Sequence, residues 1–345
     1  MSLNFTGSTP LWIVLLFAAG LVCIIKGGDV EGVNKVFKHI IKGGDLFVDA
    51  AGWIAEASGI PKFIIGATIV SFATTLPEML VSVFAALEGN ADIAVGNAVG
   101  SVTANTGLIM CLSLVCMTCL MERRQFGVKA CLLLAAILSL FGFTRDGRLS
   151  VAEGLLVLVI FAGFLAESLI SARREQGTEL KEDEERPAVS GKTVAGNIVK
   201  FVLGAAGIVL GAQLLIDNGS AIASLLGVPD AIIAATMIAV GTSLPELVTT
   251  LTAIRKKESS LSVGNIIGAN IMDLTLILPL CSLILGKSLP VQSQGMLLDI
   301  PACLIICAAV LVPALWKGKF QRWMGFLAGG LYIVYLTVMF TCFGA

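Results

Sequence analysis

A carboxylate that follows a proline by one residue occurs twice in this chain, each time inside a long apolar stretch. The segment from Ala67 to Glu78 reads ATIVSFATTLPE, and the segment from Ala235 to Glu246 reads ATMIAVGTSLPE. A charged group at the centre of a bilayer costs roughly 2.5–3.5 kcal/mol. Two acidic side chains at one repeat spacing therefore indicate a functional site rather than accidental packing.

The residues around the first of these carboxylates favour cation binding. Pro77 has no amide hydrogen and crowds the preceding turn, so we expect a break or kink that frees the carbonyls of Ala73 and Thr74. In hydrocarbon a freed carbonyl needs a partner. Hydroxyl groups of Thr74 and Thr75 and the carboxylate of Glu78 complete a set of oxygen ligands that Ca²⁺ and Na⁺ prefer. The second copy offers the equivalent groups on Thr242, Ser243 and Glu246.

The repeat continues without a gap, so that 59–105 corresponds to 227–273. GNAVG recurs as GNIIG, and Asn105 falls on Asp273. Ser101 lies four residues before Asn105 and shares its helix face. The glycines, four residues apart, provide small faces for close helix approach. The pattern predicts that two glutamates, one aspartate and one asparagine converge near the midplane.

The charge of these two glutamates and one aspartate limits which ligands the site could bind. Three ionised carboxylates carry a charge of up to −3, which disfavours an anionic substrate. One Ca²⁺ with one proton would neutralise them, and several Na⁺ would do so equally well. We expect no lysine or arginine inside the spans to pair with them.

The composition is that of a membrane protein. Hydrophobic residues make up 57% of the chain, charged residues 14%, and the mean hydropathy is +0.94, whereas soluble domains carry about 25% charged residues. No basic patch interleaved with aromatics suggests nucleic acid. We expect the lipid bilayer as surroundings, no cofactor and no obligate protein partner.

The apolar runs predict an all-α membrane protein with ten transmembrane helices, arranged as two inverted five-helix repeats. The halves are expected at 1–172 and 194–345, joined by a cytoplasmic linker at 173–193. The expected spans are 9–25, 60–87, 93–119, 126–144, 150–172, 194–216, 229–253, 260–286, 296–316 and 321–343.

Loop charges support this count. Of the 23 lysines and arginines, 20 fall on one side, including Lys129, and 3 on the other. By the positive-inside rule the populated side is cytoplasmic. We therefore expect a multi-pass protein of the cell (inner) membrane with both termini on the non-cytoplasmic side.

A duplicated stretch interrupts the first half. IIKGGD occurs at 24–29 and again at 40–45. We interpret 24–45 as a tandem duplication in a cytoplasmic loop, with an interfacial amphipathic helix as the alternative. His39, the only histidine, is interpreted as a loop residue.

The paired motifs, ATIVSFATTLPE with GNAVGSVTAN and ATMIAVGTSLPE with GNIIGANIMD, resemble the two alpha repeats of the sodium/calcium exchanger family, bacterial/archaeal type, within the cation/calcium antiporter superfamily. The resemblance implies Na⁺-driven exchange of Ca²⁺ by alternating access, with the first and sixth spans sliding across the rest. It implies that Glu78 and Glu246 hold Ca²⁺ and that Thr74 and Thr242 contribute backbone carbonyls. The flanking, mainly Na⁺, positions are then Thr75, Ser101, Ser243, Asn105 and Asp273.

Three residues depart from the family pattern: Ala73 replaces a glycine, Thr75 a serine, and Ala269 a serine. The last removes one Na⁺ ligand and affects the stoichiometry. We expect Ala269→Ser to raise the apparent Na⁺ affinity, and an unchanged Na⁺ dependence would mean that another group has replaced the missing hydroxyl.

Other readings remain open at this point. An H⁺- or K⁺-coupled antiporter for Ca²⁺ or another divalent cation would need no Na⁺ gradient. A passive cation channel would show flux without a counter-ion. An intramembrane enzyme using the paired acids is disfavoured, because neither glutamate has a neighbouring nucleophile–base pair or an HExxH helix.

Overall fold

The computed structural model describes residues 31–117, 123–179, 191–225 and 241–342. The predicted first span, the first copy of the duplicated IIKGGD and about half of the predicted seventh span lie outside these residues. The described chain is helical except for one short antiparallel ladder, in which β1 (Arg148–Leu149) pairs with β2 (Leu289–Pro290).

Apart from the helix at 31–58, the helices follow the predicted spans. They are α2 (Glu31–Ser58), α3 (Lys62–Ile65), α4 (Ser71–Leu87), α5 (Ala91–Ala104), α6 (Cys111–Cys116), α7 (Arg123–Phe143), α8 (Val151–Glu179), α9 (Gly191–Leu225), α11 (Leu244–Lys256), α12 (Ser259–Met272), α13 (Leu278–Leu285), α14 (Ile300–Lys317) and α15 (Arg322–Cys342). Four π-helical segments join or precede them: η1 (Gly66–Val70), η2 (Asn105–Met110), η4 (Asp273–Ile277) and η5 (Gly295–Asp299). A single-turn 3₁₀ segment, η3 (Thr144–Asp146), follows α7.

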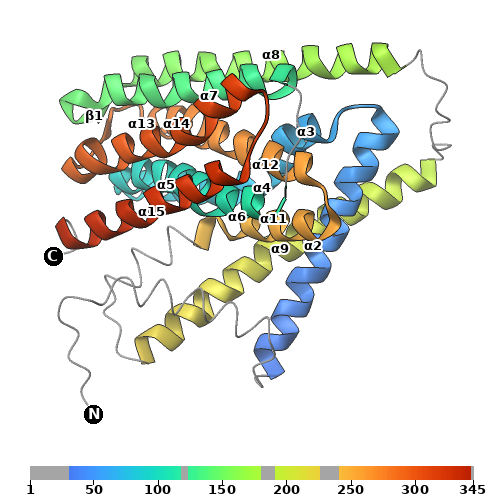
Figure 1. Cartoon of the computed structure of the whole chain (residues 1–345). Helices are drawn as coiled ribbons and strands as arrows, with labels where there is room; N and C mark the ends of the chain where they lie inside the picture. Colours follow the sequence, from blue (N-terminus) through green and yellow to red (C-terminus); the bar gives the residue numbers. More distant parts are fainter. Residues whose placement is uncertain (1–30, 118–122, 180–190, 226–240, 343–345) are drawn as a thin grey trace.

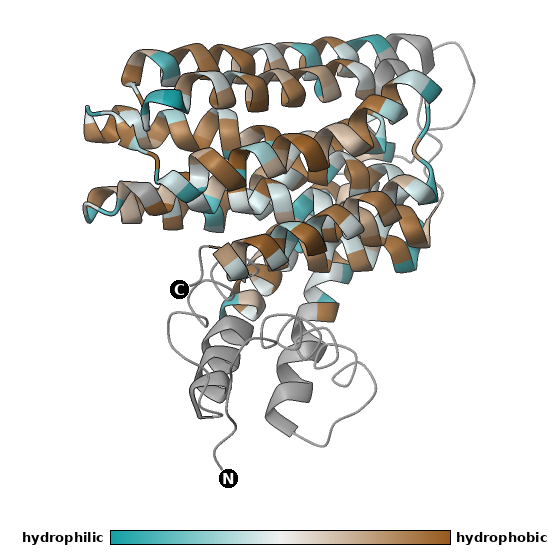
Figure 2. Ribbon diagram, turned by 60° about the vertical axis from the view of Figure 1, so that its left-hand side comes forward, coloured by the Kyte–Doolittle hydropathy of each residue, from teal (hydrophilic) through white to brown (hydrophobic). Residues whose placement is uncertain are grey.

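Among the described residues, eight helical segments are long and apolar enough to cross a membrane. They coincide with eight of the ten predicted spans. Large apolar side chains face outward along them, for example Val159, Leu297 and Phe326, each more than 60% exposed. Brown, hydrophobic ribbon accordingly reaches the outer helices in Figure 2. Outward apolar surface of this extent is that of a protein surrounded by lipid.

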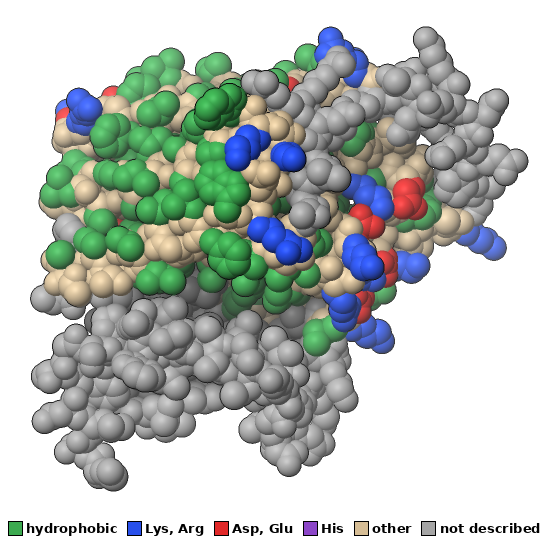
Figure 3. Space-filling model, in the orientation of Figure 1, with side chains coloured by type: hydrophobic (Ala, Val, Ile, Leu, Met, Phe, Trp, Pro, Cys, Tyr) green, Lys and Arg blue, Asp and Glu red, His purple; other side chains and the backbone are tan. Residues whose placement is uncertain are grey.

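Charged side chains mark the two ends of the bundle. In Figure 3 they gather at the right-hand end, where α2 meets α3 in Figure 1. There Lys62 pairs with Glu258 at 2.8 Å, and Lys256 pairs with Asp49 at 2.6 Å. The β1–β2 ladder joins two connections, around 148 and 289, that the charge count placed together on the opposite side. The connections that the alternation of spans places on the same side of the membrane thus lie at the same end of the structure.

The duplicated stretch is not a loop where the structure describes it. α2 is helical from Glu31 and includes the second copy of IIKGGD. It crosses α9 (Figure 1) at a point where both helices carry glycine. A Cβ at Gly204 would lie 2.6 Å from the amide nitrogen of Phe47, and one at Gly43 would lie 3.2 Å from the carbonyl oxygen of Gly204. Helix contact therefore overrides the loop that the polar composition of this stretch predicted.

The predicted linker is also shorter than expected. α8 extends to Glu179 and α9 begins at Gly191, whereas the sequence predicted a linker at 173–193. Charged residues at the end of a long helix need no packed partner, so composition could not locate this end.

One lysine that was assigned to a loop is buried within a span. Lys129 on α7 is fully buried and forms an ion pair with Glu167 on α8, which also accepts a hydrogen bond from Ser171 at 2.6 Å. Its ammonium group lies 5.6 Å from the centre of the Phe63 ring. The expectation of no intramembrane lysine is thus wrong, but this lysine neutralises Glu167 and not the repeat carboxylates.

We predict that Lys129→Met destabilises the protein by about 3 kcal/mol, because it leaves Glu167 without its counter-charge. Lys129→Met combined with Glu167→Gln should recover most of this loss. Unfolding of the purified protein in detergent measures the effect, with Lys287→Met, at an exposed lysine, as the control. Equal stability of the wild type and Lys129→Met would contradict the prediction.

Candidate functional site

Two helical segments from opposite halves of the chain are in backbone contact at the centre of the molecule. A Cβ on Gly264 of α12 would lie 2.3 Å from the carbonyl oxygen of Phe63, and one on Gly268 would lie 2.2 Å from that of Ala67. Only glycine permits this approach. The contact brings η1 and α4, which carry the first Pro–Glu motif, against the second GNxxG motif.

The two prolines act differently on their helices. α4 continues through Pro77, and the irregular hydrogen bonding lies about two turns upstream in η1. In the second copy the helix is interrupted at Ser243, and Pro245 lies in the first turn of α11. The predicted break is therefore present in the second motif, whereas the first motif has a π-helical segment instead. Segments of this kind frequently occur at functional sites.

Two hydrogen bonds link the repeats in a reciprocal manner. The hydroxyl of Thr74 donates to Oδ1 of Asn265 at 3.2 Å, and the hydroxyl of Thr242 donates to Oδ1 of Asn97 at 3.3 Å. Each bond joins the Pro–Glu motif of one half to the GNxxG motif of the other. The two hydrogen bonds therefore join equivalent residues, as the internal repeat of the sequence requires.

The three acidic side chains lie in this same central region. Glu78, Glu246 and Asp273 are each 1% exposed. Glu78 interacts electrostatically with both of the others, and Asp273 interacts with Glu246. Thr74 and the backbone interact with the glutamate carboxyl groups, but no described group donates a hydrogen bond of standard geometry to any of the six oxygens. Burial of unpartnered carboxylates is costly, so these oxygens are suited to bind cations.

The amide positions extend this site. Asn105 begins η2 and Asp273 begins η4, so both repeats change their helical hydrogen bonding at the same position. Both polar atoms of the Asn105 side chain are buried without a described partner. The side chain of Asn97 instead donates to Ser82 at 3.0 Å and to the backbone carbonyl of Glu78 at 3.3 Å.

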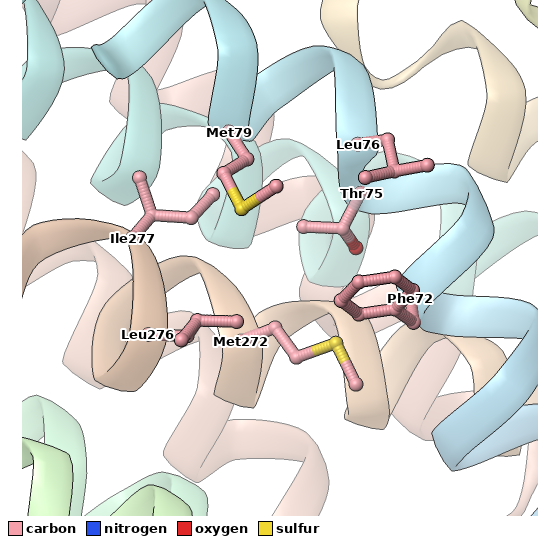
Figure 4. Close-up of a pocket in the computed structure, with 7 residues that line it drawn as sticks. All are labelled: Phe72, Thr75, Leu76, Met79, Met272, Leu276 and Ile277. Atoms are coloured by element: carbon pink, nitrogen blue, oxygen red, sulfur yellow. The ribbon is translucent and has the colours of Figure 1, made fainter. Parts of the chain in front are cut away.

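The hydroxyl groups divide into two classes. Ser101 lies 3.4 Å from the hydroxyl of Thr242. Thr75 and Ser243, by contrast, have buried hydroxyls without a described partner. Figure 4 shows Thr75 at a small pocket, with its oxygen on the side facing Phe72 and Met272. All nine residues singled out from the sequence are therefore buried.

Asn97 and Asn265 were not among the predicted site residues. The signal was available, because both are the second residue of a repeated GNxxG motif. In the part of the chain that the structure describes, no three His, Cys, Asp or Glu side chains are close enough to form a metal site by themselves. A cation in this region would thus need hydroxyl, amide or carbonyl oxygens in addition to carboxylates.

Comparison with known proteins gives one consistent result. A family model described as sodium/calcium exchanger protein matches residues 36–169 and 196–341. The chain is 30% identical to the sodium/calcium exchanger MaX1 of Methanosarcina acetivorans, over 87% of this chain and 95% of that protein. It is 31% identical to the inner membrane protein YrbG of Escherichia coli, over 87% and 93% of the two chains.

A similar structure has also been solved. A structure of the sodium-calcium exchanger NCX_Mj soaked with Na⁺ and Sr²⁺ matches with a TM-score of 0.73 and 28% identity, over 88% of this chain and 95% of that chain. The match spans both halves, so the predicted fold of ten transmembrane helices in two inverted repeats is confirmed.

Proposed function

Because this chain belongs to the sodium/calcium exchanger family, we propose that it is a secondary active antiporter that exchanges Na⁺ for Ca²⁺ by alternating access. It is a multi-pass membrane transporter and not an enzyme. The observation that carries the proposal is the group of three buried carboxylates, from both repeats, whose oxygens form no hydrogen bond of standard geometry with described residues. Such oxygens suit Na⁺ and Ca²⁺ as cargo, and no resident cofactor is needed.

Within this proposal the repeat residues have separate roles. Glu78 and Glu246 hold Ca²⁺, and Thr74 and Thr242 fix the backbone beside them through their bonds to the opposite repeat. The remaining oxygens serve mainly Na⁺. They come from Thr75, Ser243, Ser101, Asn105 and Asp273.

We further propose that the chain divides into two halves, 1–172 and 194–345, and that the first span of each half slides across the remaining helices around a central site. The two separate matches to the family model, one in each half, support this division. Where α2 crosses α9, both helices carry glycine, so no side chains interlock there to oppose sliding. The location proposed is the cell (inner) membrane, supported by the description of YrbG, with both termini on the non-cytoplasmic side.

The proposal predicts Ca²⁺ uptake into proteoliposomes only when they are loaded with Na⁺. Matched vesicles loaded with K⁺ or choline should show little uptake, because the outward movement of Na⁺ drives the exchange. The measurement is the initial rate of ⁴⁵Ca²⁺ accumulation, and protein-free vesicles correct for leakage.

The same assay separates the other readings. Equal uptake from choline-loaded vesicles after a proton gradient is imposed would assign the exchange to H⁺. Uptake that requires internal K⁺ would assign it to K⁺. Uptake that follows only the Ca²⁺ gradient, whatever the internal cation, would indicate a channel and would contradict antiport.

A further inference from the structure

Two serines of the first repeat correspond to alanines in the second repeat. Ser101 of the first GNxxG region corresponds to Ala269 in the second repeat, so the second repeat lacks this hydroxyl. One turn before the threonines of the Pro–Glu motifs the same difference occurs, because Ser71 corresponds to Ala239. The first repeat therefore carries both hydroxyl groups, and the second repeat carries neither.

Ser71 and Ser101 lie at two equivalent contacts between the repeats. Ser71 lies on α4, and its Oγ would be 2.6 Å from a Cβ on Gly268 of α12. Gly268 immediately precedes Ala269. In the reciprocal contact Ser101 lies 3.4 Å from the hydroxyl of Thr242, which is the equivalent of Thr74. The serine of the α4–α12 contact is thus on α4 rather than on α12.

Ser71 is also aligned with the carboxylate of its own helix. Ser71, Thr75 and Glu78 are spaced by four and three residues, so they lie along one face of α4. They are 0%, 4% and 1% exposed. This face presents two hydroxyl groups and one carboxylate in succession.

The hydrogen bonding of Ser71 leaves its oxygen able to accept. Its hydroxyl donates to the backbone carbonyl of Thr68 at 3.1 Å and lies 3.9 Å from the sulfur of Met272. No described group donates to this oxygen. A hydroxyl oxygen whose hydrogen is already directed elsewhere keeps its lone pairs for a cation.

We propose that the Ser71 hydroxyl is a Na⁺ ligand of the site between α4 and α12, supplying the oxygen that Ala269 lacks. The proposal deepens the proposed function and rests on it. It also changes one expectation from the sequence. Because the hydroxyl is already supplied, Ala269→Ser alone should leave the Na⁺ dependence nearly unchanged.

The test uses Ser71→Ala, Ala269→Ser and the double variant in the full-length protein. Ser71→Ala should raise the Na⁺ concentration for half-maximal exchange about fivefold, the factor that corresponds to about 1 kcal/mol. Half-maximal Ca²⁺ in the absence of competing Na⁺ should not change. The double variant should return the Na⁺ dependence toward that of the wild type, because the hydroxyl has moved to the facing helix.

Ser282→Ala is the matched control. Ser282 is also fully buried, and its hydroxyl donates to the carbonyl three residues earlier at 2.9 Å, but it faces Gly154 of α8. It should leave the Na⁺ dependence unchanged. If Ser71→Ala behaves like Ser282→Ala, the proposal is wrong, whether or not the double variant folds.

A second measurement does not depend on transport. Na⁺ added to purified protein in choline buffer should raise the thermal unfolding temperature, since a ligand stabilises the state that it binds. Ser71→Ala should shift this dependence to higher Na⁺ by the same factor. If Na⁺ stabilises the wild type but drives no Ca²⁺ uptake, the proposed function fails while the binding site stands. Identical Na⁺ titrations of the wild type and Ser71→Ala would exclude the ligand.

Discussion

Replacing Glu78 with Gln, or Glu246 with Gln, is expected to abolish Ca²⁺ exchange while the protein remains folded and inserted. Glutamine has nearly the same shape as glutamate and keeps one carbonyl oxygen as an acceptor, and the carboxylate oxygens form no hydrogen bond of standard geometry with described residues that the substitution would remove. What is lost is one negative charge on a buried cation site. Loss of a residue that only supports a metal ligand costs 10–100-fold, so we expect loss of the ligand itself to exceed about a hundredfold.

The measurement is Na⁺-dependent ⁴⁵Ca²⁺ uptake at equal amounts of reconstituted protein. Elution from a sizing column and the thermal unfolding temperature report whether each variant is folded. Glu88→Gln is the matched control, because Glu88 lies at the exposed end of α4, beyond the buried motif. Substantial exchange by either of the two buried variants would remove the central claim about the site.

Gly268→Ala and Gly264→Ala are expected to destabilise the protein strongly. The added methyl group would lie 2.2 or 2.3 Å from a backbone carbonyl oxygen of the facing segment, which has no side-chain freedom to move aside. Overpacking of a well-packed interior typically costs 1–3 kcal/mol, and a clash between backbones should reach at least about 3 kcal/mol. The helices must separate, so the site loses its geometry as well.

Gly163→Ala distinguishes this effect from a general sensitivity to alanine. Gly163 lies in the middle of α8 and is exposed, and its Cβ would be 3.9 Å from Leu132. Alanine is the better helix former, so this control should be neutral or slightly stabilising. Unfolding in detergent compares the three variants. Wild-type stability in Gly264→Ala and Gly268→Ala would mean that α12 does not approach η1 as closely as described.

The central features of the fold could be predicted because they are repeated. A carboxylate in an apolar stretch is expensive, and its recurrence with the same neighbours indicated Glu78 and Glu246 together. The span limits followed from runs of apolar residues that lipid requires on the outside of the bundle. Asn105 and Asp273 were identified by the same alignment of the chain with itself.

Features that depend on contact between distant segments could not be predicted. The polar composition of α2 indicated a loop, because its packing on α9 cannot be seen in a local pattern. Lys129 was assigned to a loop because its partner Glu167 lies 38 positions away. Likewise, Pro77 was expected to break its helix, but α4 continues through it and the irregularity lies upstream in η1.

The reciprocal hydrogen bonds Thr74–Asn265 and Thr242–Asn97 mean that each half of the chain needs a residue from the other half to complete its part of the site. Each threonine is oriented by an asparagine of the other repeat. A substitution in one repeat therefore alters the geometry of the residues that it contacts in the other repeat. A second substitution across the same contact can compensate for the first. Ser71 on α4 and Ala269 on the facing α12 form such a pair. A single half expressed alone would keep its acidic residue but lose the group that orients the site beside it.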